Sequence, residues 1–303
     1  MIEGAEGLKR YGHRAMATVF EILIAEEDPA FAEGATRAAF EEIDRLEQGL
    51  SRYVANSDIT RINNLPPHGS AAVDLDTFCC LRLSMLYWEE TGGAFDVTLG
   101  ALMQCWVGND KSLLSPSPGE IERAREQTGM TSLELDEVTM TVRVHEAVPF
   151  VDLGAIGKGY AVDRAAELLK EWGVGSALVH GGTSSVYAFG KLVPHQGWPI
   201  TLSDPGRQYE VLEKVSMSDE GLGGSGIRKG RHIIDPRSGR PVEGRRAAWV
   251  LSESAARSDA LSTACMVMTP EEIGACLKRD PRLRALVVEG ENALRFGAWP
   301  ASA

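Results

Sequence analysis

Residues 152–160 of this 303-residue chain, DLGAIGKGY, place a glycine-spaced loop directly before a predicted helix. Three glycines let the backbone approach a ligand closely. The free N–H groups of a helix N-terminus favour anions, and Lys158 adds a positive charge. The spacing matches neither a P-loop nor a dinucleotide-binding fingerprint. Taken alone, the segment is equally typical of a phosphate site and of a tight strand-to-helix turn.

A carboxylate and a hydroxyl follow in residues 258–263, SDALST, where Asp259 and Thr263 are four residues apart. At that spacing they share one face of a predicted helix. Such oxygens suit Mg²⁺, which fills its remaining positions with water and substrate phosphates. The alternative is that Ser258 or Asp259 is the N-cap of this helix. From this segment alone, the cap is the favoured interpretation.

His232 precedes two apolar residues and the turn DPRSG at residues 235–239. An imidazole titrates near neutrality, so it could take a proton from an incoming hydroxyl. A lone histidine in a strand is more often structural. Elsewhere, Tyr53 and Phe95 could stack on a flat ring, and Asp96 could accept hydrogen bonds from ring or ribose donors. Each of these residues taken singly is as typical of a turn or a core.

The composition restricts the class of protein. There are 31 Lys and Arg against 43 Asp and Glu, a net charge of -12, which disfavours nucleic acid as a partner. No segment is long and apolar enough for a transmembrane helix. Five cysteines without paired metal spacing indicate free thiols. Residues 1–10 contain no secretory signal, so we expect a cytoplasmic protein, or a periplasmic one if a leader has been removed.

Hydrophobic periodicity predicts the elements that position these residues. Strands are expected at 18–25, 132–135, 139–144, 176–180, 209–216 and 247–252, with a final hairpin around 289–292. Helices are expected at 30–50, 78–91, 120–127, from the glycine loop to Gly173, at 258–268 and after Pro270. Strands and helices do not alternate strictly, which indicates an α+β fold. No linker is evident, so we expect one domain over 11–303 and an N-terminal extension over 1–10.

Taken in chain order, the segments resemble the ApbE family of FAD:protein FMN transferases over nearly the whole length. The similar segments are HRAMATVFEI (13–22), LSRYVANSDITRIN (50–63), GAFDVTLGALMQCW (93–106), DLGAIGKGYAVDRAAELL (152–169), HIIDPRSGRPV (232–242) and SDALSTACMVM (258–268). The glycine-loop segment is the most specific of them. The resemblance implies a single α+β unit related to the T-fold, with mixed or antiparallel sheets and packed helices.

The resemblance also implies residue roles. The Ala155 carbonyl with the Asp259 and Thr263 side chains would hold Mg²⁺, and Lys158 would contact the FAD phosphates. His232 would be the base, so His232 and Asp259 would be the catalytic residues. The FAD site would comprise Met16, Ser51, Arg52, Tyr53, Asp96, Lys158 and His232.

The implied reaction is Mg²⁺-dependent cleavage of FAD. FMN is attached through a phosphoester to a Ser or Thr hydroxyl of an acceptor protein, and AMP is released. Two alternatives are an FAD pyrophosphatase giving FMN and AMP, and a non-catalytic FAD-binding protein. The second is motivated by a departure from the family pattern, because the usual Gly-Gly-Asp is here Gly181-Gly182-Thr183.

Overall fold

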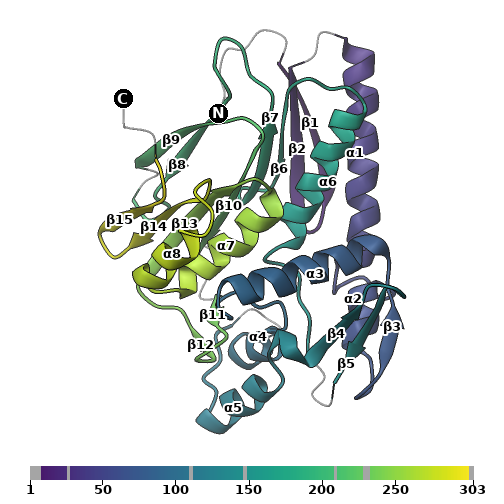
Figure 1. Cartoon of the computed structure of the whole chain (residues 1–303), viewed down its shortest axis with the longest axis vertical. Helices are drawn as coiled ribbons and strands as arrows, with labels where there is room; N and C mark the ends of the chain where they lie inside the picture. The colour runs from purple at the N-terminus through teal and green to yellow at the C-terminus, as the bar shows by residue number, and fades with distance from the viewer. Residues whose placement is uncertain are drawn as a thin grey trace.

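An eight-stranded antiparallel sheet forms the centre of the computed structural model, which describes residues 8–25, 28–108, 112–145, 149–207, 210–227 and 233–299 (Figure 1). Its strand order is β1–β2–β6–β7–β10–β13–β14–β15. The strands are β1 (Leu8–Ala15), β2 (Thr18–Ala25), β6 (Ala177–Gly181), β7 (Ser185–Phe189), β10 (Glu220–Gly226), β13 (Arg245–Ser252), β14 (Arg284–Glu289) and β15 (Asn292–Phe296).

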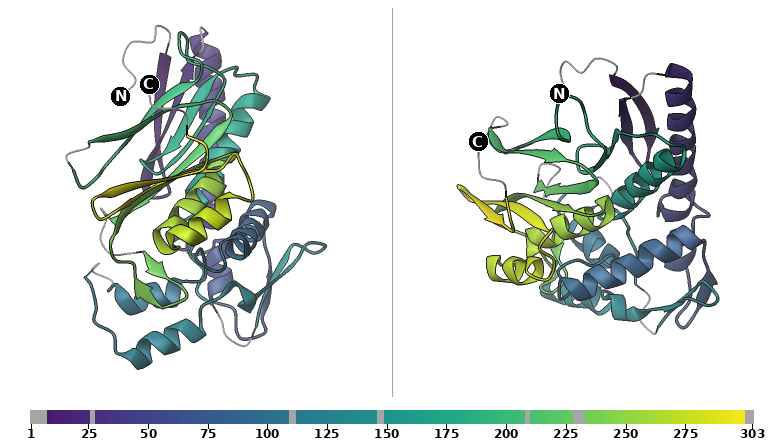
Figure 2. Two further views of the ribbon diagram at one scale, coloured as in Figure 1. Left: turned by 60° about the vertical axis from the view of Figure 1, so that its left-hand side comes forward. Right: turned by 45° about the horizontal axis from the view of Figure 1, so that its top comes forward.

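Each face of this sheet has its own covering layer (Figure 2). One face packs against α1 (Pro29–Leu50), α6 (Gly157–Glu171) and α7 (Ala255–Val267), with α8 (Pro270–Leu277) following. The other face packs against a hairpin of β8 (Trp198–Ser203) and β9 (Val211–Met217). Because side chains alternate along a strand, Val179 lies in the helix-side core and its neighbour Leu178 in the hairpin-side core.

A smaller lobe lies below the large sheet in Figure 1 and contains most of the chain between α1 and α6. It comprises α2 (Asp58–Asn63), α3 (Leu75–Glu90), α4 (Gly100–Trp106), α5 (Pro118–Glu126), a 3-10 turn (Met130–Ser132), and a sheet of β3 (Ser70–Ala72), β5 (Thr141–Val144) and β4 (Leu133–Asp136). A short hairpin of β11 (Ile234–Asp235) and β12 (Arg240–Pro241) joins it from the C-terminal part.

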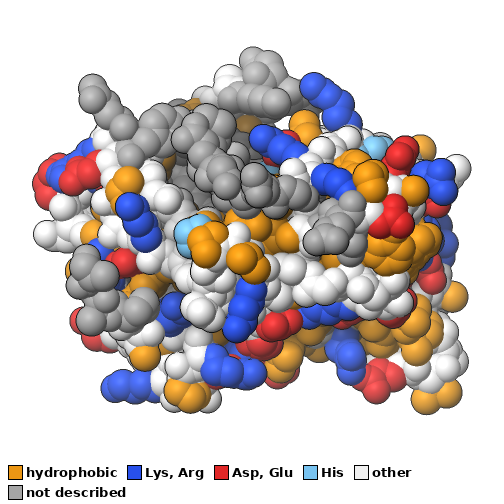
Figure 3. Space-filling model, turned by 90° about the horizontal axis from the view of Figure 1, so that it is seen from above, with side chains coloured by type: hydrophobic (Ala, Val, Ile, Leu, Met, Phe, Trp, Pro, Cys, Tyr) orange, Lys and Arg blue, Asp and Glu red, His pale blue; other side chains and the backbone are white. Residues whose placement is uncertain are grey.

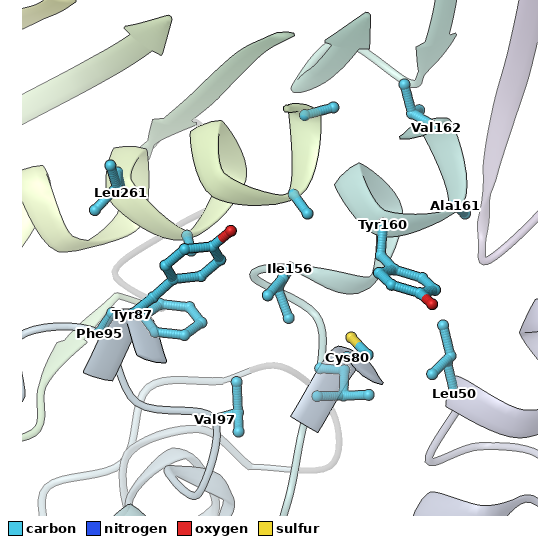
Figure 4. Close-up of a cluster of buried hydrophobic side chains, with 14 of the residues drawn as sticks. Leu50, Cys80, Tyr87, Phe95, Val97, Ile156, Tyr160, Ala161, Val162 and Leu261 are labelled. Carbon is cyan, nitrogen blue, oxygen red and sulfur yellow. The ribbon is translucent and has the colours of Figure 1, made fainter. Parts of the chain in front are cut away.

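The two parts share one apolar core. Figure 4 shows Cys80 and Tyr87 of α3 facing Ile156, Tyr160 and Leu261 from α6, its preceding loop and α7. All of these side chains belong to the helix-side core of the large sheet. The apolar core of the large sheet therefore continues into the smaller lobe.

The predicted α+β class and antiparallel pairing are confirmed. The helix expected at 258–268 starts earlier, at Ala255, and its N-cap is Ser254, so the interpretation of Ser258 or Asp259 as the cap was wrong. Residues 8–10, expected in an N-terminal extension, belong to β1 and pair with β2. The glycine-rich β10 was not predicted, because glycine has no β-forming side chain.

The surface contains charges of both signs. On the face seen in Figure 3, Lys and Arg side chains are interspersed with Asp and Glu. None of the helices in the described part of the chain has the length and apolar character that crossing a membrane requires. All five cysteines are free thiols, as predicted.

Candidate functional site

Helix α7 lies against the backbone of two other elements because glycines face it. A Cβ at Gly223 of β10 would lie 2.2 Å from the carbonyl carbon of Ser258. A Cβ at Gly159 of α6 would lie 2.4 Å from the carbonyl oxygen of Ala255. No side chain tolerates such distances, so glycine at both positions brings α7 into direct contact with the sheet and with the start of α6.

The first turn of α7 is held by a buried carboxylate from α6. Asp163 accepts the N–H groups of Ala255 at 2.7 Å and Ala256 at 2.9 Å, and Ser254 accepts that of Arg257 at 3.1 Å. Burial raises the pKa of Asp163 to about 7, although the two backbone hydrogen bonds oppose the rise. Two of the free backbone N–H groups at the start of α7 are thus hydrogen-bonded by a side chain of α6, which fixes the two helices to each other.

Asp259 lies at this junction, and its two carboxylate oxygens are in different situations. Its Oδ2 accepts the N–H of Gly159 at 2.9 Å and the hydroxyl of Ser185 at 2.6 Å. Its Oδ1 has no hydrogen-bond partner among the described residues. Burial raises the pKa of Asp259 to about 6, while the charge of Lys158 and the two hydrogen bonds oppose the rise. The group is therefore ionised at neutral pH, with one oxygen available.

The bond from Gly159 also releases a backbone oxygen. In a regular α-helix the N–H of residue 159 would donate to the carbonyl of residue 155. Here the Gly159 N–H donates to Asp259, and no group in the described part of the chain donates to the Ala155 carbonyl. One interaction therefore orients a carboxylate and leaves a carbonyl oxygen free beside it.

Thr263 is one turn further along α7, and the hydrogen bonds of its neighbours decide whether its hydroxyl is a donor or an acceptor. Ser262 donates its proton to the Asp259 carbonyl at 2.9 Å. The Ser225 Oγ lies 2.9 Å from the Ser262 Oγ and 2.9 Å from the Thr263 Oγ1. Because each hydroxyl has one proton, Ser225 donates to Ser262 and accepts from Thr263. The lone pairs of Thr263 Oγ1 are then available to another ligand.

These three oxygens fit a hard divalent cation. A carbonyl, one carboxylate oxygen and one hydroxyl are ligand types that Mg²⁺ accepts, and a set this small leaves positions for substrate oxygens. Within the described ranges there is no group of three or more His, Cys, Asp or Glu side chains that could hold a metal, so a site built only from such ligands is not found there. The predicted set of Ala155, Asp259 and Thr263 has the chemistry that the cation requires.

The start of α6 adds an anion-binding element. Helix α6 has no side-chain N-cap, and the backbone N–H of Lys158 has no partner among the described residues. The Lys158 ammonium donates to the Gly154 carbonyl at 3.1 Å and is close enough to lower the pKa of Asp259. A positive side chain and an unpaired N–H therefore lie close to Asp259, in the segment that follows Ala155, as a bound phosphate would require.

The loop with Ser51, Arg52 and Tyr53 reaches the same glycine loop. The Arg52 Nε lies 2.7 Å from the Asp152 Oδ2, as an ion pair outside hydrogen-bond alignment, and its guanidinium carbon lies 4.2 Å from the Tyr53 ring centroid. Asp152 in turn accepts the Gly154 N–H at 2.8 Å. Tyr53 is 78% exposed, so its ring is held against Arg52 while its outer face remains open.

The segment with Asp96 also contacts the glycine loop, since the Asp152 N–H donates to the Val97 carbonyl at 2.7 Å. Asp96 itself is buried, and its Oδ1 accepts both the N–H and the hydroxyl of Thr98. Burial raises its pKa to about 6, against the lowering effect of these hydrogen bonds. These contacts account for Asp96 as the residue that holds this turn, and its predicted role toward FAD stays a prediction.

Met16 and Ala17 form the two-residue turn between β1 and β2, with φ values of 48° and 55°. Such values are uncommon for residues other than glycine, so the turn is a strained one. It lies beside the β6–β7 turn, because the Gly182 N–H donates to the Val19 carbonyl at 2.9 Å. Met16 therefore lies at the end of the strands where the β6–β7 turn leads into Ser185, the first residue of β7. His232, the predicted base, lies outside the described residues.

Residues that were not predicted complete the site. Asp163, Ser185 and Ser225 orient the elements and ligands described above, and Asp152 links the two loops. Asp152 and Asp163 lie in the glycine-loop segment 152–169, and Ser185 and Ser225 follow or lie between glycines, but the sequence assigned none of the four a role. Two surface cavities, of about 560 and 330 Å³, lie elsewhere, between α4 and α5 and beside the β11–β12 hairpin, and neither is lined by a predicted site residue.

Comparisons with known proteins cover most of the chain and identify one family. The family model described as "ApbE family" matches residues 16–287. A protein of Klebsiella pneumoniae named FAD:protein FMN transferase is 27% identical, with 94% of this chain and 85% of that protein covered, and one of Vibrio cholerae with the same name is 29% identical, with 84% and 80% covered.

Solved structures agree in fold. The Pseudomonas stutzeri flavinyl transferase ApbE in its apo form superimposes with a TM-score of 0.83 at 26% identity, covering 98% of this chain and 97% of that one. The Thermotoga maritima ApbE protein gives 0.85 at 27% identity, with 96% and 97% covered. The match extends through the smaller lobe as well as the large sheet, and this chain belongs to the ApbE family.

Proposed function

We propose that this protein is a Mg²⁺-dependent FAD:protein FMN transferase. The observation that supports this most strongly is the set of available oxygens at the junction of α6 and α7. The Ala155 carbonyl precedes the uncapped start of α6, Asp259 of α7 binds that start through its Oδ2 and is influenced by the Lys158 charge, and Thr263 is one turn further along α7. A cation would bind the available oxygens, and a pyrophosphate would bind Lys158 and the free N–H at the helix start. The names of the relatives supply the substrate class.

In the proposed reaction, a Ser or Thr hydroxyl of the acceptor protein attacks the phosphorus of the FMN half of FAD. A new P–O bond forms to the acceptor, the P–O bond to the AMP half breaks, and AMP leaves. When bound, Mg²⁺ would withdraw charge from the pyrophosphate and stabilise the charge that develops on it.

The residues of the chain would bind and orient the two reactants. Lys158 and the free N–H at the start of α6 would hold the pyrophosphate. The open face of Tyr53 offers a stacking surface, which Arg52 holds in place. His232 is proposed as the base that removes the proton of the acceptor hydroxyl; this rests on the sequence alone.

The test is intact-mass spectrometry of a Thr-containing acceptor domain incubated with the full-length protein, FAD and MgCl₂, with AMP measured in parallel. We expect FMN on the acceptor and an equal amount of AMP. AMP without transfer would indicate a pyrophosphatase, and FAD binding with neither product would indicate a binding protein.

The Asp259→Asn variant is the matched control, because it removes the charge but keeps the shape of the side chain. Since Ser254, not Asp259, caps α7, we expect this variant to remain folded while losing transfer. Loss of the folded state would contradict the assignment of Asp259 to cation binding.

A further inference from the structure

We propose that Ser185 and Ser225 are positioning residues that aim the two α7 ligands, Asp259 and Thr263, at the bound cation. The inference rests on the proposed function and extends it to residues on the sheet. Both serines contact a predicted ligand through the hydroxyl. Neither was singled out by the sequence as part of a cation site.

The strand register places the two serines on the helix-facing side of the sheet. Ser185, the first residue of β7, pairs with Gly223 of β10, and Ser225 is two residues further along β10. Residues two apart on a strand face the same side, so both hydroxyls are directed at α7. Diagonal neighbours on adjacent strands are about 7–8 Å apart. One four-residue step of a helix rises about 6 Å, so the serine pair matches the spacing of Asp259 and Thr263.

Ser185 fixes which oxygen of Asp259 is available. Its hydroxyl and the Gly159 N–H both donate to Oδ2, so the carboxylate cannot turn without breaking two hydrogen bonds. Ser185 is fully buried, so its hydroxyl is not in contact with bulk solvent. Without it, Asp259 would retain a single donor and the direction of Oδ1 would be less defined.

Ser225 performs the corresponding task for Thr263. Ser225 accepts a hydrogen bond from Thr263 and donates one to Ser262, which in turn donates to the Asp259 carbonyl. This chain of hydroxyls directs the Thr263 proton toward the sheet and its lone pairs away from it. Replacing Ser225 with alanine leaves the Thr263 hydroxyl free to rotate, and the lone pairs are then presented to the cation only part of the time.

Ser184 provides a matched control. It is the neighbour of Ser185 and has the same chemistry. Its Oγ makes a long hydrogen bond of 3.4 Å to the Ser185 Oγ, in which Ser184 donates because the Ser185 proton goes to Asp259, and in the described part of the chain it has no hydrogen bond to Asp259 or Thr263. Ser184→Ala therefore removes a hydroxyl from the same turn and leaves the hydrogen bonds from Ser185 to Asp259 and between Ser225 and Thr263 in place.

The test is a titration of the full-length protein with Mn²⁺, with the unbound ion measured by electron paramagnetic resonance, alone and with FAD. Loss of an orienting partner of a metal ligand typically weakens binding about 10–100-fold. We expect such a loss for Ser185→Ala and for Ser225→Ala, less than a twofold change for Ser184→Ala, and recovery with Ser225→Thr, which restores a hydroxyl. In the transfer assay, the Mg²⁺ concentration for half-maximal rate should rise, and the rate at saturating Mg²⁺ should change much less.

Thermal unfolding of each variant separates positioning from folding. If Ser185→Ala unfolds the protein, Ser225→Ala and Ser225→Thr decide the question. Mn²⁺ affinities of the folded alanine variants equal to that of Ser184→Ala would overturn the inference while leaving the proposed function standing. Absence of Mn²⁺ binding by the wild-type protein, with or without FAD, would overturn both.

Discussion

Replacing Gly159 with alanine should separate α6 from α7 and weaken both the fold and the cation site. The added Cβ would lie 2.4 Å from the Ala255 carbonyl oxygen and 2.8 Å from the Ala256 Cα. Both are backbone atoms that no rotamer change can move, so the helices must part by roughly half an ångström or more. That movement also lengthens the hydrogen bond from the Gly159 N–H to the buried Asp259 carboxylate.

The magnitude follows from three contributions. Overpacking costs about 1–3 kcal/mol, and weakening a hydrogen bond to a buried charge costs about 1.5–3 kcal/mol. The higher helix propensity of alanine returns about 1 kcal/mol. We therefore expect Gly159→Ala to lower the free energy of unfolding by about 1.5–5 kcal/mol, measured by urea denaturation of the protein without ligands.

Gly157→Ala is the control for this experiment. It lies in the same first turn of α6, but its added Cβ would meet only the Leu153 Cβ at 3.6 Å, an ordinary contact. Its unfolding free energy should be unchanged or up to about 1 kcal/mol higher. Equal stability of the wild type and the Gly159→Ala variant, with unchanged Mn²⁺ affinity, would refute the idea that this contact sets the position of Asp259.

Three further changes test other parts of the structure. Burial raises the pKa of Asp163 to about 7, so between about pH 4 and 7 the folded state binds a proton that the unfolded state has lost. The stability that this proton contributes decreases as the pH rises through that window. In urea denaturation, the unfolding free energy of the wild type relative to Asp163→Asn should therefore be higher at pH 5 than at pH 8. Tyr53→Ala should change the unfolding free energy by less than about 0.5 kcal/mol, because the ring is 78% exposed, but should weaken FAD binding in a flavin-fluorescence titration. Thr263→Val keeps the shape and removes the hydroxyl, so it should cost about 1 kcal/mol of stability through the lost Ser225 contact and raise the Mg²⁺ needed for half-maximal transfer.

Elements with a strong apolar period were predictable from the sequence. Helix α1 and strand β2 fall within one residue of the expected ranges, because each buries one regular face in the helix-side core. Strand β10 was not predicted, since its sequence EGLGGSG has one large apolar residue, Leu222. It is a strand because its backbone pairs with β7 and β13, and it is rich in glycine because a side chain at Gly221 or Gly223 would collide with the α7 backbone. A contact between distant segments is not visible in local periodicity.

For the same reason the function of Asp259 was ambiguous from its own segment. A carboxylate near a predicted helix start is typical of a cap, and only the position of Ser254 four residues upstream of Ser258 excludes this. The hydroxyls that orient the ligands come from β7 and β10, about 75 and 35 residues before Asp259 in the chain. Serines in a turn and in a glycine-rich stretch have many ordinary explanations, so no local signal distinguishes them.

The two buried carboxylates show why the site and the fold depend on the same contact. Asp163 of α6 holds the start of α7, and Asp259 of α7 holds the N–H at the start of α6, so each helix contributes an acid to the other. Burial raises the pKa of both groups, which means that their charges lower the stability of the folded protein at neutral pH. A protein needing only to join two helices could do so with apolar side chains at no such cost. Two buried carboxylates at this junction are understandable if the charge on Asp259 binds a cation. The hydrogen bonds to Asp163 then keep α7, which carries Asp259, in place.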